Sequence, residues 1–183
     1  MTDEIQADKR IQKTLNALRD AFFDLVLSRS YDEISVSDII TKANVGRSTF
    51  YQHYKSKDDI LATSMHFPLS TLARLVYSQR ESSELISLLE HFWENRRFAP
   101  RIFSGTARKH VLETHVNLVT KQLELRAKSN TKIASIPINL LAHQIAEAHL
   151  TIVTDWLLGK GSCSIELLAK HLDHTSQSLS AGA

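Results

Sequence analysis

The sequence predicts an all-α fold of about nine helices, and three observations support this. Apolar residues recur at steps of three and four along most of the chain, as on the buried face of a helix. No stretch of useful length alternates apolar and polar residues as a half-buried strand does. Only five glycines and three prolines occur among 183 residues, which favours long helices over many turns. The hydrophobic fraction of 43% and the charged fraction of 23% are those of a soluble globular protein.

The N-terminal part of the chain begins with a long helix followed by a short one. Residues 9–29 are predicted to form the first helix, because one apolar stripe runs along it: Ile11, Leu15, Leu18, Phe22 and Leu25. A short helix follows Ser35, which lies three residues before Asp38 in the pattern of a capping box. The buried face of this helix is made by Val36, Ile39, Ile40 and Ala43.

A tight turn then leads into a third, polar helix. Asn44 stands where the chain must turn, and asparagine tolerates the left-handed conformation that a turn requires. The third helix opens at Gly46, and Phe50 and Tyr54, four residues apart, share its buried face. Two short helices joined in this way form a helix-turn-helix, whose second helix can lie in the major groove of DNA.

This segment resembles the N-terminal DNA-binding domain of TetR-family transcriptional regulators. The matching residues fall within roughly residues 10–62: Ala43-Asn44-Val45 in the turn, Thr49-Phe50-Tyr51-Gln52-His53-Tyr54 in the polar helix, and Lys57-Asp58-Asp59-Ile60-Leu61 after it. Asn44 stands where glycine is frequent in the family. The resemblance implies a DNA-binding domain at 1–56 and an effector-binding and dimerisation domain at 57–183. It also implies a homodimeric regulator, usually a repressor, that a small molecule releases from a palindromic operator.

The polar face of the third helix carries most of the candidate DNA-binding side chains. Arg47 has the length and the forked guanidinium to bind a guanine edge or a phosphate, and the amide of Gln52 suits adenine. Lys57, at a capped helix start, suits a phosphate. The full predicted set is Ser37, Arg47, Ser48, Thr49, Tyr51, Gln52, His53 and Lys57, of which Tyr51 and His53 match family positions that contact the DNA backbone. The alternative for each residue is simple surface solvation.

The distribution of charge supports a DNA-facing surface more than the total charge does. The net charge is only +2, which by itself does not indicate a nucleic-acid-binding protein. However, no acidic residue lies between Asp38 and Asp58, whereas four basic residues do: Lys42, Arg47, Lys55 and Lys57. We therefore expect this segment to face phosphates.

Further helices are predicted after residue 56. One is expected over about 57–79, with Pro68 kinking or breaking it near Phe67. The others are a helix that ends before Pro100 and helices over about 106–128, 138–158 and 164–179, with Ile102 and Phe103 in a short connection. The last two helices carry apolar residues on more than one face, including Leu140, Val153 and Leu157. We therefore expect them to form a two-fold four-helix interface in which Leu157 and Leu172 take part.

A small-molecule pocket is expected in the middle of the chain, which is rich in large aromatic residues. The candidate effector-binding residues are His66, Phe67, Trp93, Phe103, His115 and Gln122. The alternative is that these are ordinary core residues. A ligand near Phe67 would act on the helix that contains Pro68, and through it on the separation of the two recognition helices.

Other functions receive less support from the sequence. The nine histidines show no zinc-site spacing, so no metal and no cofactor are expected, and surface or interface positions explain them. No nucleophile has an activating partner, so an enzyme is the least favoured alternative, after an adaptor that works by protein contacts. The single cysteine, Cys163, fits a reducing, cytoplasmic location. No apolar run approaches the roughly 20 residues that cross a bilayer.

Overall fold

The computed structural model describes residues 2–77, 83–129 and 136–181, and over these ranges it confirms the all-α prediction. Nine α-helices and three short 3-10 turns occur in the described ranges, without a strand. The elements are α1 (Thr2–Ser28), η1 (Tyr31–Glu33), α2 (Val36–Ala43), α3 (Arg47–His53), α4 (Lys57–Ala73), η2 (Arg74–Val76), α5 (Ser83–Glu94), η3 (Arg96–Phe98), α6 (Ala99–Ile102), α7 (Gly105–Lys128), α8 (Ile138–Leu157) and α9 (Ile165–Ser180).

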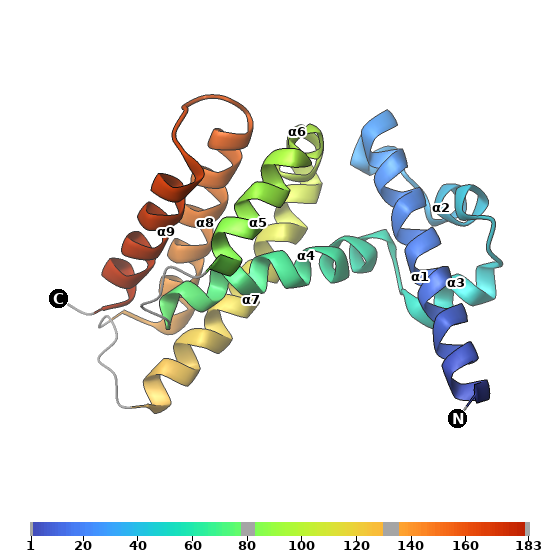
Figure 1. Cartoon of the computed structure of the whole chain (residues 1–183), viewed down its shortest axis with the longest axis horizontal. Coiled ribbons are helices and arrows are strands. Elements are labelled where there is room, and N and C mark those ends of the chain that lie inside the picture. Colours follow the sequence, from blue (N-terminus) through green and yellow to red (C-terminus); the bar gives the residue numbers. More distant parts are fainter. Residues whose placement is uncertain (1, 78–82, 130–135, 182–183) are drawn as a thin grey trace.

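The helices α1, α2 and α3 form a group at one end of the molecule, and α4 leads away from it (Figure 1). The predicted capping box at the start of α2 is confirmed: the Asp38 amide donates to Ser35 Oγ at 3.2 Å, and the Ser35 amide donates to the Asp38 carboxylate at 2.8 Å. These bonds with Ser35 hold the pKa of Asp38 below its usual value. Asn44 ends α2 in the left-handed conformation, with φ 53° and ψ 48°. Its amide donates to carbonyls of the last turn, which caps the helix.

The helix α4 passes through Pro68 without the break that was predicted there. It continues to Ala73, because Leu69, Leu72 and Ala73 are completely buried and their packing outweighs the local effect of the proline. The predicted end near residue 79 falls outside the described residues. Pro68 still has a cost, since it has no N–H to donate to the carbonyl of Ser64 one turn earlier.

Among the C-terminal helices, α7 packs chiefly against α4 and α8 (Figure 1). The α9 helix packs against α5, α8 and η2. The short connection that was expected around Ile102 and Phe103 contains the four-residue helix α6. The hydrophobic core runs from α1 through to α9, so the N-terminal helices share buried contacts with the rest of the chain.

A chain of hydrogen bonds between neutral polar groups crosses this core from α7 to α9. His115 Nε2 lies 3.0 Å from His149 Nδ1, and His149 Nε2 lies 2.7 Å from Ser176 Oγ. The Ser176 hydroxyl donates to the Leu172 carbonyl at 2.6 Å, so it accepts from His149, which in turn accepts from His115. Burial lowers the pKa of His149 to about 4. Burial, together with the neighbouring His149, lowers the pKa of His115 well below its ordinary value, so both rings are neutral at pH 7.

Candidate nucleic-acid interface

One face of helix α3 is buried against the protein, and the opposite face is exposed to solvent. Phe50 is fully buried, and Tyr54 packs beside it with ring centroids 6.1 Å apart. The predicted DNA-binding side chains of the helix lie on the remaining faces: Arg47, Ser48, Tyr51 and Gln52 are exposed, and Thr49 and His53 are half-buried. Ser37, in the first turn of α2, is exposed as well. The buried pair therefore leaves the polar side chains of α3 available to a ligand as broad as duplex DNA.

The start of α4 is capped by Ser56, and its first turn also carries the carboxylates of Asp58 and Asp59, which oppose an anion there. Ser56 Oγ accepts from the amides of Asp58 and Asp59, at 3.1 and 3.3 Å. The Asp59 carboxylate also accepts from the Lys55 amide at 3.0 Å, which fixes the connection between α3 and α4. A helix N-terminus in this position favours a phosphate through its dipole.

Lys57 takes a different place from the one that the sequence suggested. Its ammonium donates to the carbonyls of Tyr31 at 2.6 Å and Ile34 at 2.9 Å, with a longer contact to Asp32 at 3.4 Å. It also lies 4.5 Å from the centroid of the Tyr31 ring. The Tyr31 carbonyl also accepts from the Ile34 amide at 3.2 Å, so the Lys57 ammonium is an added donor at the end of η1. This contact occupies the charge that was expected to meet a phosphate.

The four basic residues of the acid-free segment divide into two pairs. Lys42 forms an ion pair with Asp24 of α1 at 3.2 Å. Its charge, like that of Lys57, is therefore engaged by other groups of the chain. Arg47 and Lys55 are exposed and form no ion pair in the part of the chain that the structure describes. Lys55 was not among the predicted site residues, although it lies in the acid-free segment of the sequence. Arg47 and Lys55 are thus the two basic side chains of this segment that stay exposed and unpaired among the described residues.

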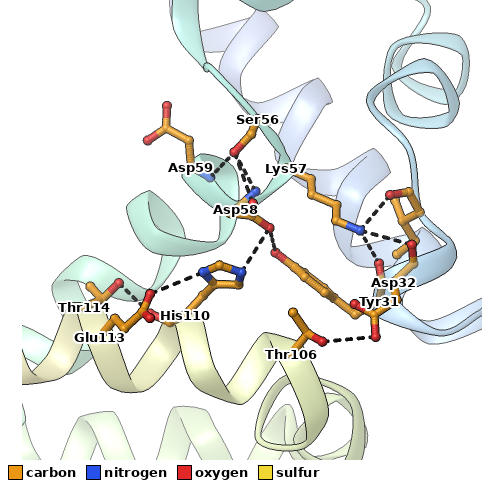
Figure 2. Close-up of polar contacts among 11 residues, drawn as sticks. Tyr31, Asp32, Ser56, Lys57, Asp58, Asp59, Thr106, His110, Glu113 and Thr114 are labelled. Atoms are coloured by element: carbon orange, nitrogen blue, oxygen red, sulfur yellow. Dashed lines mark hydrogen bonds and ion pairs between the residues drawn. The ribbon is translucent and has the colours of Figure 1, made fainter.

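A polar cluster that was not predicted joins the N-terminal helices to α7 (Figure 2). The Tyr31 hydroxyl donates to the Asp58 carboxylate, and His110 Nε2 of α7 lies 3.6 Å from that same carboxylate. Nearby, the Thr106 hydroxyl donates to Asp32 at 3.1 Å. Burial raises the pKa of Tyr31, and the hydrogen bond to Asp58 raises it further, so the phenol stays protonated. These residues are far apart in sequence, and no local pattern links them.

The six predicted effector-binding residues do not gather around one cavity. Phe67 is 71% exposed and His66 is exposed on α4. Trp93 stacks on Trp156 at the surface, with ring centroids 4.8 Å apart, while His115 faces His149 in the core. Gln122 is half-buried on α7. Only Phe103 borders a cavity of about 550 Å³, which lies between α1 and the helices α4, α5, α6 and α8. The residues were selected by type, which does not determine where their side chains point.

The surface of α8 and α9 also differs from the prediction in its details. Val153, Leu157 and Leu172 are all buried within the chain itself, so they are not free to meet a second copy. Ile152, on the same helix as Val153, is 37% exposed. The apolar residues that remain exposed on and between these helices are Leu140, Ile152, Leu158 and Leu167. Val153 and Leu157 are buried because α8 buries two adjacent faces within its own chain. An interface between two copies at this surface stays a prediction.

The described residues contain neither a cluster of metal ligands nor a helix suited to crossing a membrane. No three side chains of the types that ligate metals come close enough to one another there to hold an ion. His143 and Glu147, one turn apart on α8, do not act together, since Glu147 pairs with Arg108 of α7 through two hydrogen bonds. None of the described helices combines the length and the apolarity that crossing a membrane requires.

The fold and the exposed α3 define the class: a helix-turn-helix protein of the kind that binds DNA. Residues 18–63 match the sequence profile of the bacterial regulatory proteins of the tetR family. The chain is 32% identical over 94 residues to DhaS of Lactococcus lactis, an HTH-type transcriptional activator of the dhaKLM operon, covering 49% of each protein. It is 43% identical over 61 residues to YxbF of Bacillus subtilis, an uncharacterized HTH-type transcriptional regulator, covering 33% of this chain and 16% of that one. These matches thus span half or less of the length of the curated relatives.

A solved structure extends the similarity to nearly the whole chain. The TetR transcriptional regulator of Streptococcus agalactiae 2603V superposes with a TM-score of 0.61 at 25% identity, covering 94% of this chain and 98% of that one. Residues 18–63 thus match the DNA-binding part of the tetR family, with its helix-turn-helix in α2 and α3, and the chain as a whole shares the fold of a TetR transcriptional regulator.

Proposed function

We propose that the protein is a ligand-responsive transcriptional repressor that binds a palindromic DNA operator as a homodimer. The observation that supports this best is α3 itself, whose polar side chains are exposed while Phe50 and Tyr54 anchor it from behind. In this proposal Arg47 contacts a base edge or a phosphate and Lys55 contacts a phosphate, with the backbone at the start of α4 as a further phosphate site. The DNA-binding domain is residues 1–56, and residues 57–183 bind the effector and dimerise.

The proposed partner of the α8–α9 surface is a second copy of the chain. Leu140 and Leu167 are 58% and 59% exposed, and Ile152 and Leu158 add to the apolar surface. A two-fold axis lets such a patch cover itself, because each residue meets the same patch on the other copy. A dimer also presents two α3 helices to DNA, which a palindromic operator requires. This function corresponds to a location in the cytoplasm.

The experiment that tests the proposal is selection of bound fragments from the genomic DNA of the encoding organism, followed by titration of a labelled duplex that carries the common sequence. We expect a palindrome whose half-sites lie about one helical turn apart. Binding without sequence preference, or no binding, would contradict the proposal and favour an adaptor that works through protein contacts. A promoter reporter then decides the sign of regulation: DhaS of Lactococcus lactis is an activator, and increased expression would replace repression with activation here.

A further inference from the structure

The cavity of about 550 Å³ is shared between the DNA-binding domain and the rest of the chain. Its walls come from α1 on one side and from α4, α5, η3, α6 and α8 on the other, where α1 contacts η3 and α6. Figure 1 shows α1 and α6 facing each other across the start of α4. The volume lies in the range of sites that bind small molecules. A molecule in this cavity would therefore touch both parts of the protein at once.

The floor of the cavity is apolar. It is made by Met65, Phe92, Ile102, Phe103 and Leu157, all of which are buried. Phe23 of α1 and Phe98 of η3 meet edge to face at the border, with ring centroids 5.4 Å apart. This aromatic pair spans the two parts of the chain. The largest share of any ligand's surface would thus lie against carbon atoms, which favours an apolar body.

Among the polar groups at the wall, two neutral acceptors lie beside the apolar floor: the Ser64 carbonyl and the Asn95 side-chain oxygen. Pro68 cannot supply the N–H that the Ser64 carbonyl would receive in an ordinary helix, and both residues border the cavity. The Asn95 amide nitrogen donates to the His91 carbonyl at 2.9 Å, and Asn95 Oδ1 is a further acceptor on a residue that borders the cavity. A ligand that donates a hydrogen bond would satisfy these oxygens.

The charges around the cavity do not select an ion. Asp20 and Asp24 of α1 are balanced by Arg19 of the same helix and by Arg97 of η3, and Asp24 already pairs with Lys42. All four of these side chains are on exposed residues, so water screens them. Neither an anion nor a cation gains a net attraction from this arrangement.

We propose that this cavity binds a neutral, largely apolar molecule with a hydrogen-bond donor, of the alcohol or phenol class, and that this ligand regulates DNA binding by holding α1 against η3 and α6. The inference rests on the proposed function, which assigns the effector to residues 57–183 as a whole, and here α1 contributes to its site as well. Because the ligand bridges the two parts, it stabilises one orientation of the DNA-binding domain over others. Its effect on operator affinity and the operator's effect on its affinity must then be equal in size.

The test uses four probes with one ring system: β-naphthol, its methyl ether, β-naphthoate and β-naphthylmethylamine. Their binding to the full-length protein is measured at pH 7, without DNA, by calorimetry and by quenching of tryptophan fluorescence. We expect β-naphthol to bind saturably and more tightly than the ether, the anion and the cation. Preference for either ion would overturn the proposed ligand class, and no saturable binding by any probe would overturn the site.

Two variants locate the binding. Pro68→Ala restores the N–H that bonds the Ser64 carbonyl, so it is expected to weaken β-naphthol binding about tenfold while leaving the ether unchanged. Pro137→Ala, far from the cavity at the start of α8, is the matched control and should change neither. Ser64→Phe fills the space and should abolish binding of all four probes. Undiminished β-naphthol binding by a folded Ser64→Phe protein would show that the ligand sits elsewhere.

Operator binding is measured separately in the presence of saturating β-naphthol. A change in operator affinity that Ser64→Phe removes would support the regulatory part of the inference, and an unchanged affinity would refute it. Failure of the site and failure of the proposed function remain distinguishable. A protein that binds its operator but no probe lacks the site, whereas one that binds β-naphthol but no operator has the site and lacks the function.

Discussion

The buried pair His115–His149 makes the stability of the fold depend on pH. Below about pH 6.5 the histidines of the unfolded chain take up protons, whereas His149 in the core stays neutral until its pKa of about 4. The unfolded state therefore binds more protons than the folded state in this window. It follows that the free energy of unfolding decreases as the pH falls from 6.5 and levels off only near pH 4. His115, whose pKa is also lowered, contributes with the same sign.

The size of the effect follows from the displacement of the pKa. A histidine with a pKa of about 4 in the fold and 6.5 when unfolded lowers the free energy of unfolding by about 2 kcal/mol between pH 7 and pH 5. Aspartate and glutamate titrate mainly below this interval, so they contribute less to it. A loss of this size is a substantial part of the roughly 5–15 kcal/mol by which domains are stable.

The assay is urea unfolding followed by circular dichroism at several pH values between 7 and 5. His149→Gln keeps an N–H for Ser176 but cannot take up a proton, so its stability should fall less over this interval, by about 2 kcal/mol. His171→Gln, an exposed histidine on α9, is the control and should follow the wild type. If wild type and His149→Gln lose the same stability between pH 7 and pH 5, His149 is not excluded from protonation and the interpretation is wrong.

Three further predictions concern the DNA surface, the dimer and the domain contact. Arg47→Ala is expected to cost about 1–3 kcal/mol of operator binding, whereas Lys57→Ala should lower the free energy of unfolding by about 1–2 kcal/mol and leave the salt dependence of binding unchanged. Anisotropy titrations at several salt concentrations check this, and a slope reduced by about one in Lys57→Ala would mean that its ammonium reaches a phosphate. Leu167→Glu should produce folded monomers in sedimentation velocity; a dimer that persists at micromolar concentration would place the interface elsewhere. Tyr31→Phe should lower the free energy of unfolding by about 1–2 kcal/mol in urea through its lost bond to Asp58, with Tyr51→Phe as the neutral control, and equal values for both would show that the bond adds nothing.

Local signals in the sequence were sufficient for the helices and for the helix-turn-helix. The capping box of Ser35 and the turn at Asn44 depend on residues a few positions apart, and both are present as predicted. Phe50 and Tyr54 lie on the buried side of α3 for the same reason. Which of the exposed side chains contact DNA stays a prediction.

Features that depend on distant residues were beyond the reach of the sequence. Lys57 carries the positive charge that a phosphate site needs. However, its ammonium donates to the carbonyls of Tyr31 and Ile34, in η1 and just after it, more than twenty residues away in the sequence. His110 and Asp58 meet only because α7 packs beside α4. Of the two effects predicted for Pro68, a kink or a break, the break is wrong because a rule about one residue cannot weigh the buried contacts of the whole helix.

The stacked pair Trp93 and Trp156 has a consequence for observing the protein at work. These are the only two tryptophans of the chain, one on α5 and the other on α8, with ring centroids 4.8 Å apart and planes inclined by 34°. Two indoles this close couple their electronic transitions, so they should produce a paired signal in circular dichroism. The strength of that signal depends on how the rings are placed. Any sliding of α5 along α8 would therefore be visible in unlabelled protein, with no dye attached to the molecule.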